Sequence, residues 1–434
     1  MVAWSTTAAR AAIVAGARTP FAKIGGPLRH VHVADLAKAV FQETLYRAPW
    51  PSDRLDEVIL GNVVMPADAT NLARVSALWA GVPPHVPAMT VQRNCASGME
   101  AIAEAAARIR ASQGRAILAG GAESMSSIPL LFPADSAEPF AQLYRARTVR
   151  QRVGAIAALR PRHLRPVSAL ECGLIDPTCG LIMGKTAEVL AHEFGISRRQ
   201  QDEFALRSHQ RALAAAGAGS FTEESVPVYA GDGFEPVTTD VGPRANQTLD
   251  ALMKLTPIFD RRDGTITVGN SCQLTDGAAA VLVMEADLAR SEGLQPLGYV
   301  RAYAYAGVDP ARMGLGPVFA IDQLCRSTGL SLNDVSLFEI NEAFAAQVLA
   351  CLKAMSSAKF AEAHLNRAEP LGEIPPDRLN VNGGAIALGH PVGASGARLV
   401  LTSLIEMRRR DLDLGVAALC VGGGQGAAIL LERR

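Results

Sequence analysis

The sequence predicts an α/β protein in which layers of helices cover layers of strands, and three observations support this prediction. Short apolar runs typical of strands alternate with longer segments of helical periodicity along the 434 residues. The composition combines 49% hydrophobic residues and 39 glycines with only 5% aromatics, which suits closely packed layers better than a disordered or disulfide-stabilised chain. Two long patterns also occur twice in the same order, which predicts duplicated halves.

The predicted strands are six short apolar runs, each bounded by turn-forming or polar residues. They lie at residues 11–16, 57–62, 115–121, 280–284, 335–340 and 416–423. The final stretch, GVAALCVGGGQGAAILL, is interrupted by glycines and therefore predicts two strands joined by a turn rather than one long apolar segment.

A helix is predicted directly after Cys95. Apolar residues recur at helical spacing from Met99 to Ile109 and form one stripe that can be buried. Glutamates lie in the first turns and arginines in the last turns, so both charges match the helix dipole. Gly114 is expected to end the helix.

The internal repeat consists of two pairs of similar segments. Residues 34–63 and 316–344 each run from a helix into an apolar strand. Residues 95–121 and 393–423 each contain a turn, the triplet Ala-Ser-Gly, a helix, a polar stretch, an apolar strand and a glycine turn. Because both pairs appear in the same order, we expect two halves with the same topology.

A segment of different character separates the halves. It contains the polar sequence SRRQQDEFALRSHQRALAAAGAG, which predicts a helix with charge pairs four residues apart and a glycine stop. Residues 264–287 then return to strand patterns and are expected to complete the first half. The predicted organisation is a first half at 1–130 together with 253–290, an inserted loop domain at 131–252, and a second half at 291–434.

Composition excludes several classes of protein. Lys plus Arg and Asp plus Glu are both 42, so no net charge indicates nucleic-acid binding. The seven cysteines are scattered, without a CxxC pair or a cluster at metal spacing, which indicates reduced thiols, no metal and a cytoplasmic location. The first residues lack a secretory signal pattern, and no uninterrupted apolar run reaches the roughly 18 residues of a membrane span.

Cys95, in the sequence QRNCASGME, is the first candidate for chemistry. Free cysteines are usually buried apolar residues, and this alternative stays open from its position alone. Yet Cys95 lies at the N-terminal end of a predicted helix, where free backbone N–H groups and the helix dipole stabilise a thiolate. Such a position is expected to lower the thiol pKa below its usual value of about 8.5. This position favours a nucleophile, and a buried packing residue stays the alternative.

Three further motifs contain candidate residues. His390 lies in NGGAIALGHPVGASGAR, a loop with five glycines at the position in the repeat that corresponds to Cys95. Cys420 and Gly422 lie in CVGGGQG, where a thiol acid or base stands beside backbone N–H groups able to bind an oxyanion. Asn341, in EINEAFAAQ, is expected either to cap the following helix or to hold a catalytic water.

These motifs together resemble the thiolase family. NCASGM, NEAF, GHPVGASG and CVGGGQG occur in this order, as do GGAESMS, MGKTAE and TVGNSCQLTDGAAA, over nearly the whole chain. The resemblance implies a five-layered αβαβα fold with duplicated halves and an inserted loop domain. This organisation agrees with the one predicted above from the repeat.

The resemblance also implies a mechanism. Cys95 would attack the 3-keto carbon of a 3-ketoacyl-CoA after His390 takes its proton, and Cys420 would protonate the departing acetyl-CoA enolate. One oxyanion would be held by His390 and a water on Asn341, the other by the backbone N–H groups of Cys95 and Gly422. No metal or redox cofactor is needed, and coenzyme A is a substrate.

The resemblance assigns the coenzyme A side of the site to Met183, Ser271 and Cys272. One position departs from the family: acetoacetyl-CoA thiolases often have a histidine directly before the methionine, whereas this chain has Ile182. This change favours degradative thiolysis, as in fatty acid β-oxidation, over the biosynthetic acetoacetyl-CoA thiolase, which stays the alternative. A ketoacyl synthase is less compatible, because those enzymes lack a counterpart of Cys420. A non-catalytic scaffold would be expected to have lost one of these residues.

The segment 139–170 has seven arginines and no acidic residue. Its arginines interleave with apolar residues, so part of it predicts a basic amphipathic helix for an anionic membrane surface or an acidic partner. A solvated basic face and electrostatic steering of coenzyme A are the alternatives. The resemblance further implies a homodimer or homotetramer, in some cases with a hydratase/dehydrogenase subunit. The other four cysteines, Cys172, Cys179, Cys325 and Cys351, are expected to be packing residues.

Overall fold

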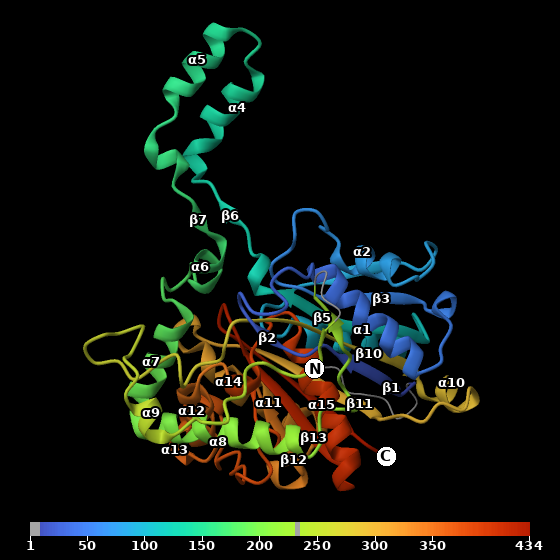
Figure 1. The fold of residues 1–434 in the computed structure, drawn as a ribbon. Coiled ribbons are helices and arrows are strands. Elements are labelled where there is room, and N and C mark those ends of the chain that lie inside the picture. The colour runs from blue at the N-terminus through green and yellow to red at the C-terminus, as the bar shows by residue number, and fades with distance from the viewer. Residues whose placement is uncertain (1–8, 231–234) are drawn as a thin grey trace.

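The computed structural model describes residues 9–230 and 235–434 (Figure 1). The first eight residues of the predicted first half, on which the interpretation of the N-terminus partly rests, lie outside the described residues, as do residues 231–234 of the predicted loop domain.

Ten strands of the described chain form one continuous hydrogen-bonded sheet (Figure 1). The strands of the first half are β1 (Ala11–Arg18), β2 (Ala22–Lys23), β3 (Glu57–Gly61), β4 (Ala88–Val91), β5 (Ala116–Ser124) and β10 (Thr275–Glu285). Those of the second half are β11 (Gly298–Gly307), β12 (Leu337–Ile340), β13 (Leu414–Val421) and β14 (Gln425–Glu432). The strand order is β12-β13-β14-β11-β1-β10-β5-β3-β4, with β2 beside β10, so the halves meet where β1 pairs with β11.

The two halves repeat the same topology. In the first, β3 is parallel to β5, β5 is antiparallel to β10, and β10 is antiparallel to β1. In the second, β12, β13, β14 and β11 follow with the same directions. The predicted duplication is therefore confirmed. The six predicted strands are all present, although β12 begins two residues later than expected and β10 begins five residues earlier.

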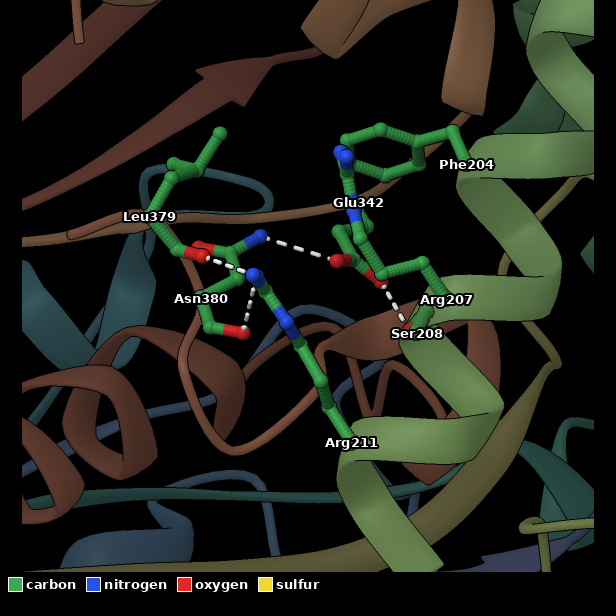
Figure 2. A pocket seen from close by; sticks show the side chains of 7 residues that line it. All are labelled: Phe204, Arg207, Ser208, Arg211, Glu342, Leu379 and Asn380. Atoms are coloured by element: carbon green, nitrogen blue, oxygen red, sulfur yellow. Dashed lines mark hydrogen bonds between the residues drawn. The ribbon is translucent and has the colours of Figure 1, made fainter. Parts of the chain in front are cut away.

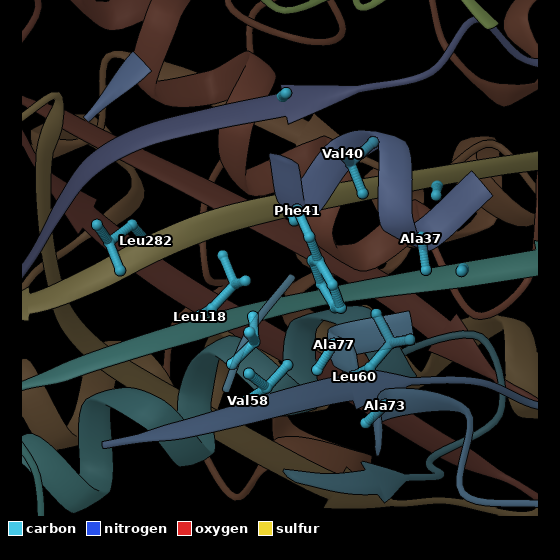
Figure 3. Close-up of a cluster of buried hydrophobic side chains, with 14 of the residues drawn as sticks. Ala37, Val40, Phe41, Val58, Leu60, Ala73, Ala77, Leu118 and Leu282 are labelled. Carbon is cyan, nitrogen blue, oxygen red and sulfur yellow. The ribbon is translucent and has the colours of Figure 1, made fainter. Parts of the chain in front are cut away.

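Helices on the outer face of the first half cover its strands. In α1 (Val33–Arg47), the buried side chains follow the i, i+3, i+4 spacing of one helix face, which packs on the sheet with α2 (Leu72–Trp79). Figure 3 shows Phe41 of α1 among Leu60 of β3 and Leu118 of β5, all fully buried. Burying one such side chain stabilises the fold by about 1.5–3 kcal/mol.

Two further layers of helices complete the fold. On the outer face of the second half, α11 (Gly316–Thr328) and α12 (Ala345–Met355) pack on the strands. Between the two groups of strands, α3 (Ser97–Arg110) packs against α15 (Ser395–Arg410) in a shared apolar core. The layers therefore alternate as helices, strands, helices, strands and helices, which confirms the predicted αβαβα arrangement.

Glycines allow α3 and α15 to approach very closely at their N-terminal ends. A Cβ added at Gly98 would lie 2.7 Å from the carbonyl oxygen of Gly393 and 2.9 Å from the backbone nitrogen of Ala397. A Cβ at Gly396 would lie 2.4 Å from the backbone nitrogen of Met99. Because backbone atoms cannot yield as side chains can, no larger residue fits at either glycine. The Ala-Ser-Gly triplets thus form a second contact between the halves, in addition to the pairing of β1 with β11.

The predicted end of α3 at Gly114 is wrong. The helix ends at Arg110, and Ser112 adopts a left-handed conformation with a φ of 58°. The backbone N–H of Ser112 donates to Ile109 and that of Gln113 to Arg108, a Schellman motif that satisfies the last carbonyl groups. Serine seldom takes this conformation, so the sequence signal for a glycine cap pointed to the wrong residue.

The insertion between the adjacent strands β5 and β10 carries its own small elements. They are β6 (Leu130–Leu131), α4 (Ala137–Arg145), α5 (Val149–Ala158), β7 (Val167–Ser168), α6 (Ala169–Leu174), α7 (Met183–Glu193), α8 (Arg198–Gly217), β8 (Val228–Tyr229), β9 (Pro236–Val237) and α9 (Leu249–Met253). The predicted polar helix is α8, which begins with a capping box formed by Ser197 and Gln200. The boundaries at residues 131 and 252 stay a prediction.

The arginine-rich segment is a projecting hairpin, defined here as residues 130–168. Its helices α4 and α5 lie side by side and stand away from the body on the two-stranded ribbon of β6 and β7 (Figure 1). One amphipathic helix was expected in part of the segment, and the structure has two short ones, broken at residues 146–148. Within residues 9–230 and 235–434, no helix is both long and apolar enough to cross a bilayer.

The α3–α15 contact predicts a strong effect of Gly396→Ala. Since the added Cβ would overlap the backbone of α3, we expect the free energy of unfolding to fall by about 2–3 kcal/mol, measured by urea denaturation. Gly154→Ala is the matched control, because Gly154 lies in α5 and a Cβ there meets nothing within 4 Å. That variant should be neutral or stabilising by up to ~1 kcal/mol. Equal midpoints for wild type and Gly396→Ala would contradict the proposed tight packing.

Candidate active site

Cys95 lies in a tight turn directly before α3. Asn94 takes a left-handed conformation with a φ of 42°, and its Nδ2 donates to the carbonyl oxygen of Gly422 at 2.8 Å. The Ser97 hydroxyl accepts from the backbone N–H of Arg93 at 2.8 Å and donates to the carbonyl oxygen of Asn94 at 2.7 Å. The turn that carries the thiol is therefore fixed to its own half and to the second half at once.

The pKa of the Cys95 thiol is raised rather than lowered, so the predicted direction is wrong. Cys95 is half-buried, and loss of solvation around its sulfur is the main cause, to which the charge of Glu123 adds. The backbone N–H groups of Gly422 and of Cys95 itself act in the opposite direction without overcoming burial. The sulfur is therefore a neutral thiol at rest, which needs a base to become a nucleophile.

Cys420 is fully buried at the end of β13, and three glycines follow it. Gly423 and Gly424 have φ values of 85° and 75°, a conformation that requires glycine in the turn to β14. Burial, and then the neighbouring thiols of Cys95, Cys351 and Cys272, raise the pKa of Cys420 well above its usual range. A thiol that keeps its proton is suited to act as an acid.

His390 has one ring nitrogen engaged and the other free. Its Nδ1 lies 2.6 Å from the Ser395 hydroxyl, which itself donates to the carbonyl oxygen of Pro391 at 3.1 Å. Because the hydroxyl proton is used there, the Ser395 oxygen must accept from His390, which places the imidazole proton on Nδ1. Nε2 is buried without a hydrogen-bond partner. Burial and the charge of Arg398 lower the pKa of His390 to about 4, so the ring is neutral and Nε2 is an available base.

Asn341 does not cap a helix, so that alternative is wrong. Helix α12 begins four residues later, with Phe344 at its N-cap position. The Asn341 backbone N–H donates to Ala418 of β13, and its side chain is completely buried. Both the Oδ1 and Nδ2 atoms lack a partner within the chain, although buried amides normally have one. The remaining prediction, that this amide holds a water, accounts for both atoms.

Glu342, next in the chain, ties Asn341 to its surroundings. Its carboxylate accepts from Ser208 of α8 at 2.6 Å, from the Asn380 amide at 2.9 Å and from the backbone N–H of Ile386 at 3.2 Å. Figure 2 shows the contacts with Ser208 and Asn380, together with Arg211 of α8, which donates to nearby backbone carbonyl groups. Ile386 lies in α14 (Ala385–Leu388), directly before His390, so one carboxylate positions two site loops and the inserted domain.

Two of the predicted coenzyme A residues, Ser271 and Cys272, lie on a segment that pairs with the residues just before α12. Ser271 forms a β-bridge with Phe344, and its hydroxyl donates to the Thr267 carbonyl oxygen at 2.7 Å. The N–H of Cys272 donates to Ala343, and burial followed by the Cys95 thiol raises the pKa of Cys272 to about 12.

Met183 begins α7 and lies over the glycine turn. Its sulfur is 3.5 Å from where a Cβ of Gly422 would be, and its side chain packs with a small apolar cluster that includes Cys420 and Phe344. The inserted domain thus brings an apolar side chain beside the backbone N–H that faces the Cys95 sulfur.

Of the other cysteines, Cys351 is buried, while Cys179 and Cys325 are half-buried. The expectation of packing is wrong for Cys172, which is exposed in the short helix α6. Ser395 was missed by the sequence prediction. The signal was present in the repeat, since Ser97 and Ser395 are the serines of the two Ala-Ser-Gly triplets, and each holds the turn before its helix.

The site therefore combines a thiol at a helix N-terminus, a neutral imidazole, a second protonated thiol and paired backbone N–H groups. This set is suited to acyl transfer through a cysteine. Two protein-family models match the chain: "Thiolase, N-terminal domain" over residues 11–287 and "Thiolase, C-terminal domain" over residues 294–433. The chain belongs to the thiolase family.

Individual relatives are similar over almost the whole chain. The chain is 41% identical to a 3-ketoacyl-CoA thiolase of Salmonella choleraesuis (strain SC-B67), covering 98% of this chain and 97% of that one. Among solved structures, the acetyl-CoA acetyltransferase of Bacillus anthracis matches with a TM-score of 0.87 and 37% identity, over 99% of this chain and 100% of that one. The human mitochondrial 3-ketoacyl-CoA thiolase in complex with CoA matches with a TM-score of 0.84 and 35% identity, over 98% of both chains.

Proposed function

We propose that the protein cleaves 3-ketoacyl-CoA with coenzyme A, yielding acetyl-CoA and a shortened acyl-CoA, through an acyl group on Cys95. The observation that supports this most strongly is the protonation pattern of the site. Nε2 of His390 is buried without a hydrogen-bond partner, and the pKa values of the Cys95 and Cys420 thiols are raised. A neutral base and two neutral thiols are the starting state that such a reaction needs.

The steps follow from these groups. Nε2 of His390 takes the Cys95 proton as the sulfur attacks the 3-keto carbon, and the C2–C3 bond breaks. The electron pair leaves as the enolate of acetyl-CoA, which Cys420 protonates. His390 then returns its proton to the Cys420 thiolate. The thiol of a new coenzyme A next gives its proton to His390 and attacks the acyl group, and the Cys95 thiolate that leaves takes this proton back from His390. Reversal of the first part is a Claisen condensation.

Two oxyanions form on this path. The backbone N–H groups of Cys95 and Gly422 both face the Cys95 sulfur, so an acyl oxygen on that sulfur lies within their reach. The unpartnered amide of Asn341 is suited to a water that, with protonated His390, stabilises the enolate oxygen. Loss of one such donor typically slows a reaction by about 10²–10³-fold.

Coenzyme A is the substrate in this proposal, and Met183, Ser271 and Cys272 are its proposed contacts. Relatives named both as 3-ketoacyl-CoA thiolase and as acetyl-CoA acetyltransferase match the chain. Ile182, which replaces a histidine common in acetoacetyl-CoA thiolases, supports the degradative direction. The buried Cys420 argues against a ketoacyl synthase. All seven cysteines are unpaired, which supports a cytoplasmic location.

The edge of the sheet supports the proposed homo-oligomer. Strand β4 is at the end of the strand order and pairs only with β3 within the described chain. Its residues, Ala88–Val91, are mostly apolar and half-buried. The backbone groups along such an open edge can form hydrogen bonds with a strand of another chain. A second copy of the chain, joined at β4, would cover this edge close to Cys95. The hydratase/dehydrogenase partner stays a prediction from the resemblance.

The projecting hairpin is proposed to dock on an anionic membrane surface. Along α5, Val149, Val153 and Ile156 follow one another at helical spacing and are 79%, 60% and 57% exposed. Arg150 and Arg152 flank this stripe, and the hairpin extends away from the body (Figure 1). Exposed apolar side chains flanked by arginines are the pattern of a helix that lies in a lipid interface.

The division of roles between the two thiols can be tested with Cys420→Ser. Because a serine hydroxyl is too weak an acid near neutral pH, thiolysis and condensation should slow by roughly 10²-fold or more. Exchange of acetyl groups between acetyl-CoA and labelled coenzyme A needs only Cys95 and His390, so it should retain most of its rate. Steady-state kinetics measure the rate of thiolysis, and isotope exchange measures the rate of acetyl transfer to labelled coenzyme A. An equal loss in both reactions would contradict the roles assigned here.

Membrane docking predicts a specific effect of charge reversal in the hairpin. Replacing Arg147, Arg150 and Arg152 by glutamate should abolish cosedimentation with vesicles rich in phosphatidylglycerol, with thiolysis of a short-chain substrate unchanged. The matched control reverses Arg29, Arg199 and Arg290, which are exposed and lie outside the hairpin, and should still bind.

Two results would contradict membrane docking. If wild type and both variants fail to bind anionic vesicles, the hairpin serves a protein partner or none. If docking is retained in the hairpin variant while the apparent coenzyme A requirement rises, the arginines act by electrostatic steering.

A further inference from the structure

The repeat places Glu123 where the second half has Cys420. In the sheet, Glu123 of β5 pairs with Gly277 of β10, and Cys420 of β13 pairs with Gly426 of β14. Both glycines begin the same Gly-Ala-Ala sequence in equivalent strands.

The neighbouring ladders give the same register. Gly121, two residues before Glu123, pairs with Gly61 of β3. Ala418, two residues before Cys420, pairs with Ile340 of β12. Gly61 and Ile340 are each followed by an asparagine. Two independent pairings therefore agree.

Other site residues also have counterparts in the opposite half. Asn341 corresponds to Asn62, since each directly follows the equivalent strand. Aligning the Ala-Ser-Gly triplets sets Cys95 against Gly393. The molecule thus contains a second group of residues, arranged by the same topology as the active site. In this second group, the Asn62 amide and the Gly393 N–H donate to the carboxylate of Glu123, which takes the place of the Cys420 thiol.

The carboxylate of Glu123 is completely enclosed and contacts only donors. Oε2 accepts from the backbone N–H groups of Val63 and Gly393, both at 3.0 Å. Oε1 accepts from the Asn62 amide at 3.0 Å and from the backbone N–H of Val64 at 3.1 Å. Glu123 has no exposed surface. An ionised carboxylate satisfies all four donors, whereas a protonated one would direct its own proton at a donor.

These contacts join the two halves at the turn that carries His390. Val63 and Val64 follow β3 of the first half, and Gly393 lies between His390 and the start of α15. A Cβ at Gly393 would lie 3.0 Å from Glu123 Oε2 and 2.9 Å from the carbonyl oxygen of Ala122, so the turn is pressed against β5. No other side chain is hydrogen-bonded to the Gly393 N–H among the described residues.

We propose that Glu123 is a positioning residue of the thiolase reaction, an internal anion that replaces the thiol in the counterpart site and holds the Gly393 turn so that His390 faces Cys95. This inference rests on the proposed roles of His390 and Cys95. The Glu123 carboxylate takes no proton from substrate and acts only through the turn.

The contact should depend on pH. Burial raises the pKa of Glu123 to about 7, while its hydrogen bonds act in the opposite direction. The titratable side chain that faces it is the Cys95 thiol at the start of α3, and its partners on the β3 loop and the Gly393 turn are uncharged amides. Below pH 7 the carboxyl group becomes protonated, and its protonated oxygen can no longer accept from both of its donors. His390 has a pKa of about 4, so its own protonation lies well below that range.

The test is the pH dependence of kcat for thiolysis in wild type, Glu123→Gln and Asp322→Asn. Wild type should lose activity as pH falls through about 7. In Glu123→Gln, either amide orientation directs an NH2 group at two donors, so kcat should drop at least tenfold at pH 8 with KM for coenzyme A nearly unchanged. The fall near pH 7 should vanish, because no group there titrates.

Asp322→Asn is the control for loss of a buried carboxylate. Asp322 lies in α11, where it accepts from Arg326 and Arg367, away from the site. Its kcat should stay within about twofold of wild type. Circular dichroism and the unfolding midpoint check that each variant folds.

Three results would overturn the proposal: a wild-type kcat without a fall near pH 7, a Glu123→Gln variant with wild-type kcat, or one that keeps the fall. The wild-type profile is informative even if Glu123→Gln does not fold. A wild type inactive at every pH would instead contradict the proposed function.

Discussion

The contact between α3 and α15 is the constraint on which the rest of the site depends. Because Gly98 and Gly396 lack side chains, the two helix N-termini lie against each other at backbone distance. Cys95 precedes the first serine by two residues and His390 precedes the second by five, so one contact fixes both turns. The strands bring the remaining groups, because β12 and β13 are neighbours, Asn341 directly follows β12, and Cys420 is the next-to-last residue of β13. Duplication thus supplies two similar turns, and divergence gives one a thiol and the other an imidazole.

Burial, rather than the helix dipole, determines the protonation states of the site. Desolvation raises the pKa of the Cys95 and Cys420 thiols and lowers that of His390, so all three are neutral at rest. Glu123 is the opposite case, because its four donors require a charge that burial opposes. Since its pKa in the folded protein is raised above the usual carboxyl value, ionisation makes the fold less stable as pH rises from about 4.5 to 7. The ionised carboxylate that the Gly393 turn requires is therefore obtained at the expense of stability, a pattern common at functional sites.

Much of the fold and of the candidate site could be predicted from the sequence, because those features are periodic or repeated. The strands and the two halves follow from apolar runs and from the paired segments, and the four motifs point to Cys95, His390, Cys420 and Asn341. What the sequence could not indicate depends on three-dimensional surroundings. The desolvation of Cys95 reversed the pKa expected from its place at a helix N-terminus. The cap at Ser112 used a residue that seldom adopts a left-handed conformation. Glu123 could not be singled out from the sequence, because only the strand register shows that it corresponds to Cys420.

The thiols of Cys272 and Cys420 both lie near Cys95, yet the proposed mechanism requires that Cys95 carries the acyl group. The most direct measurement is peptide mass spectrometry of the wild-type protein after brief exposure to acetyl-CoA and acid quenching. We expect one acetyl group, on the peptide that contains Cys95, because the backbone N–H groups of Cys95 and Gly422 face this sulfur. An acetyl group on Cys272 or Cys420 instead would contradict it.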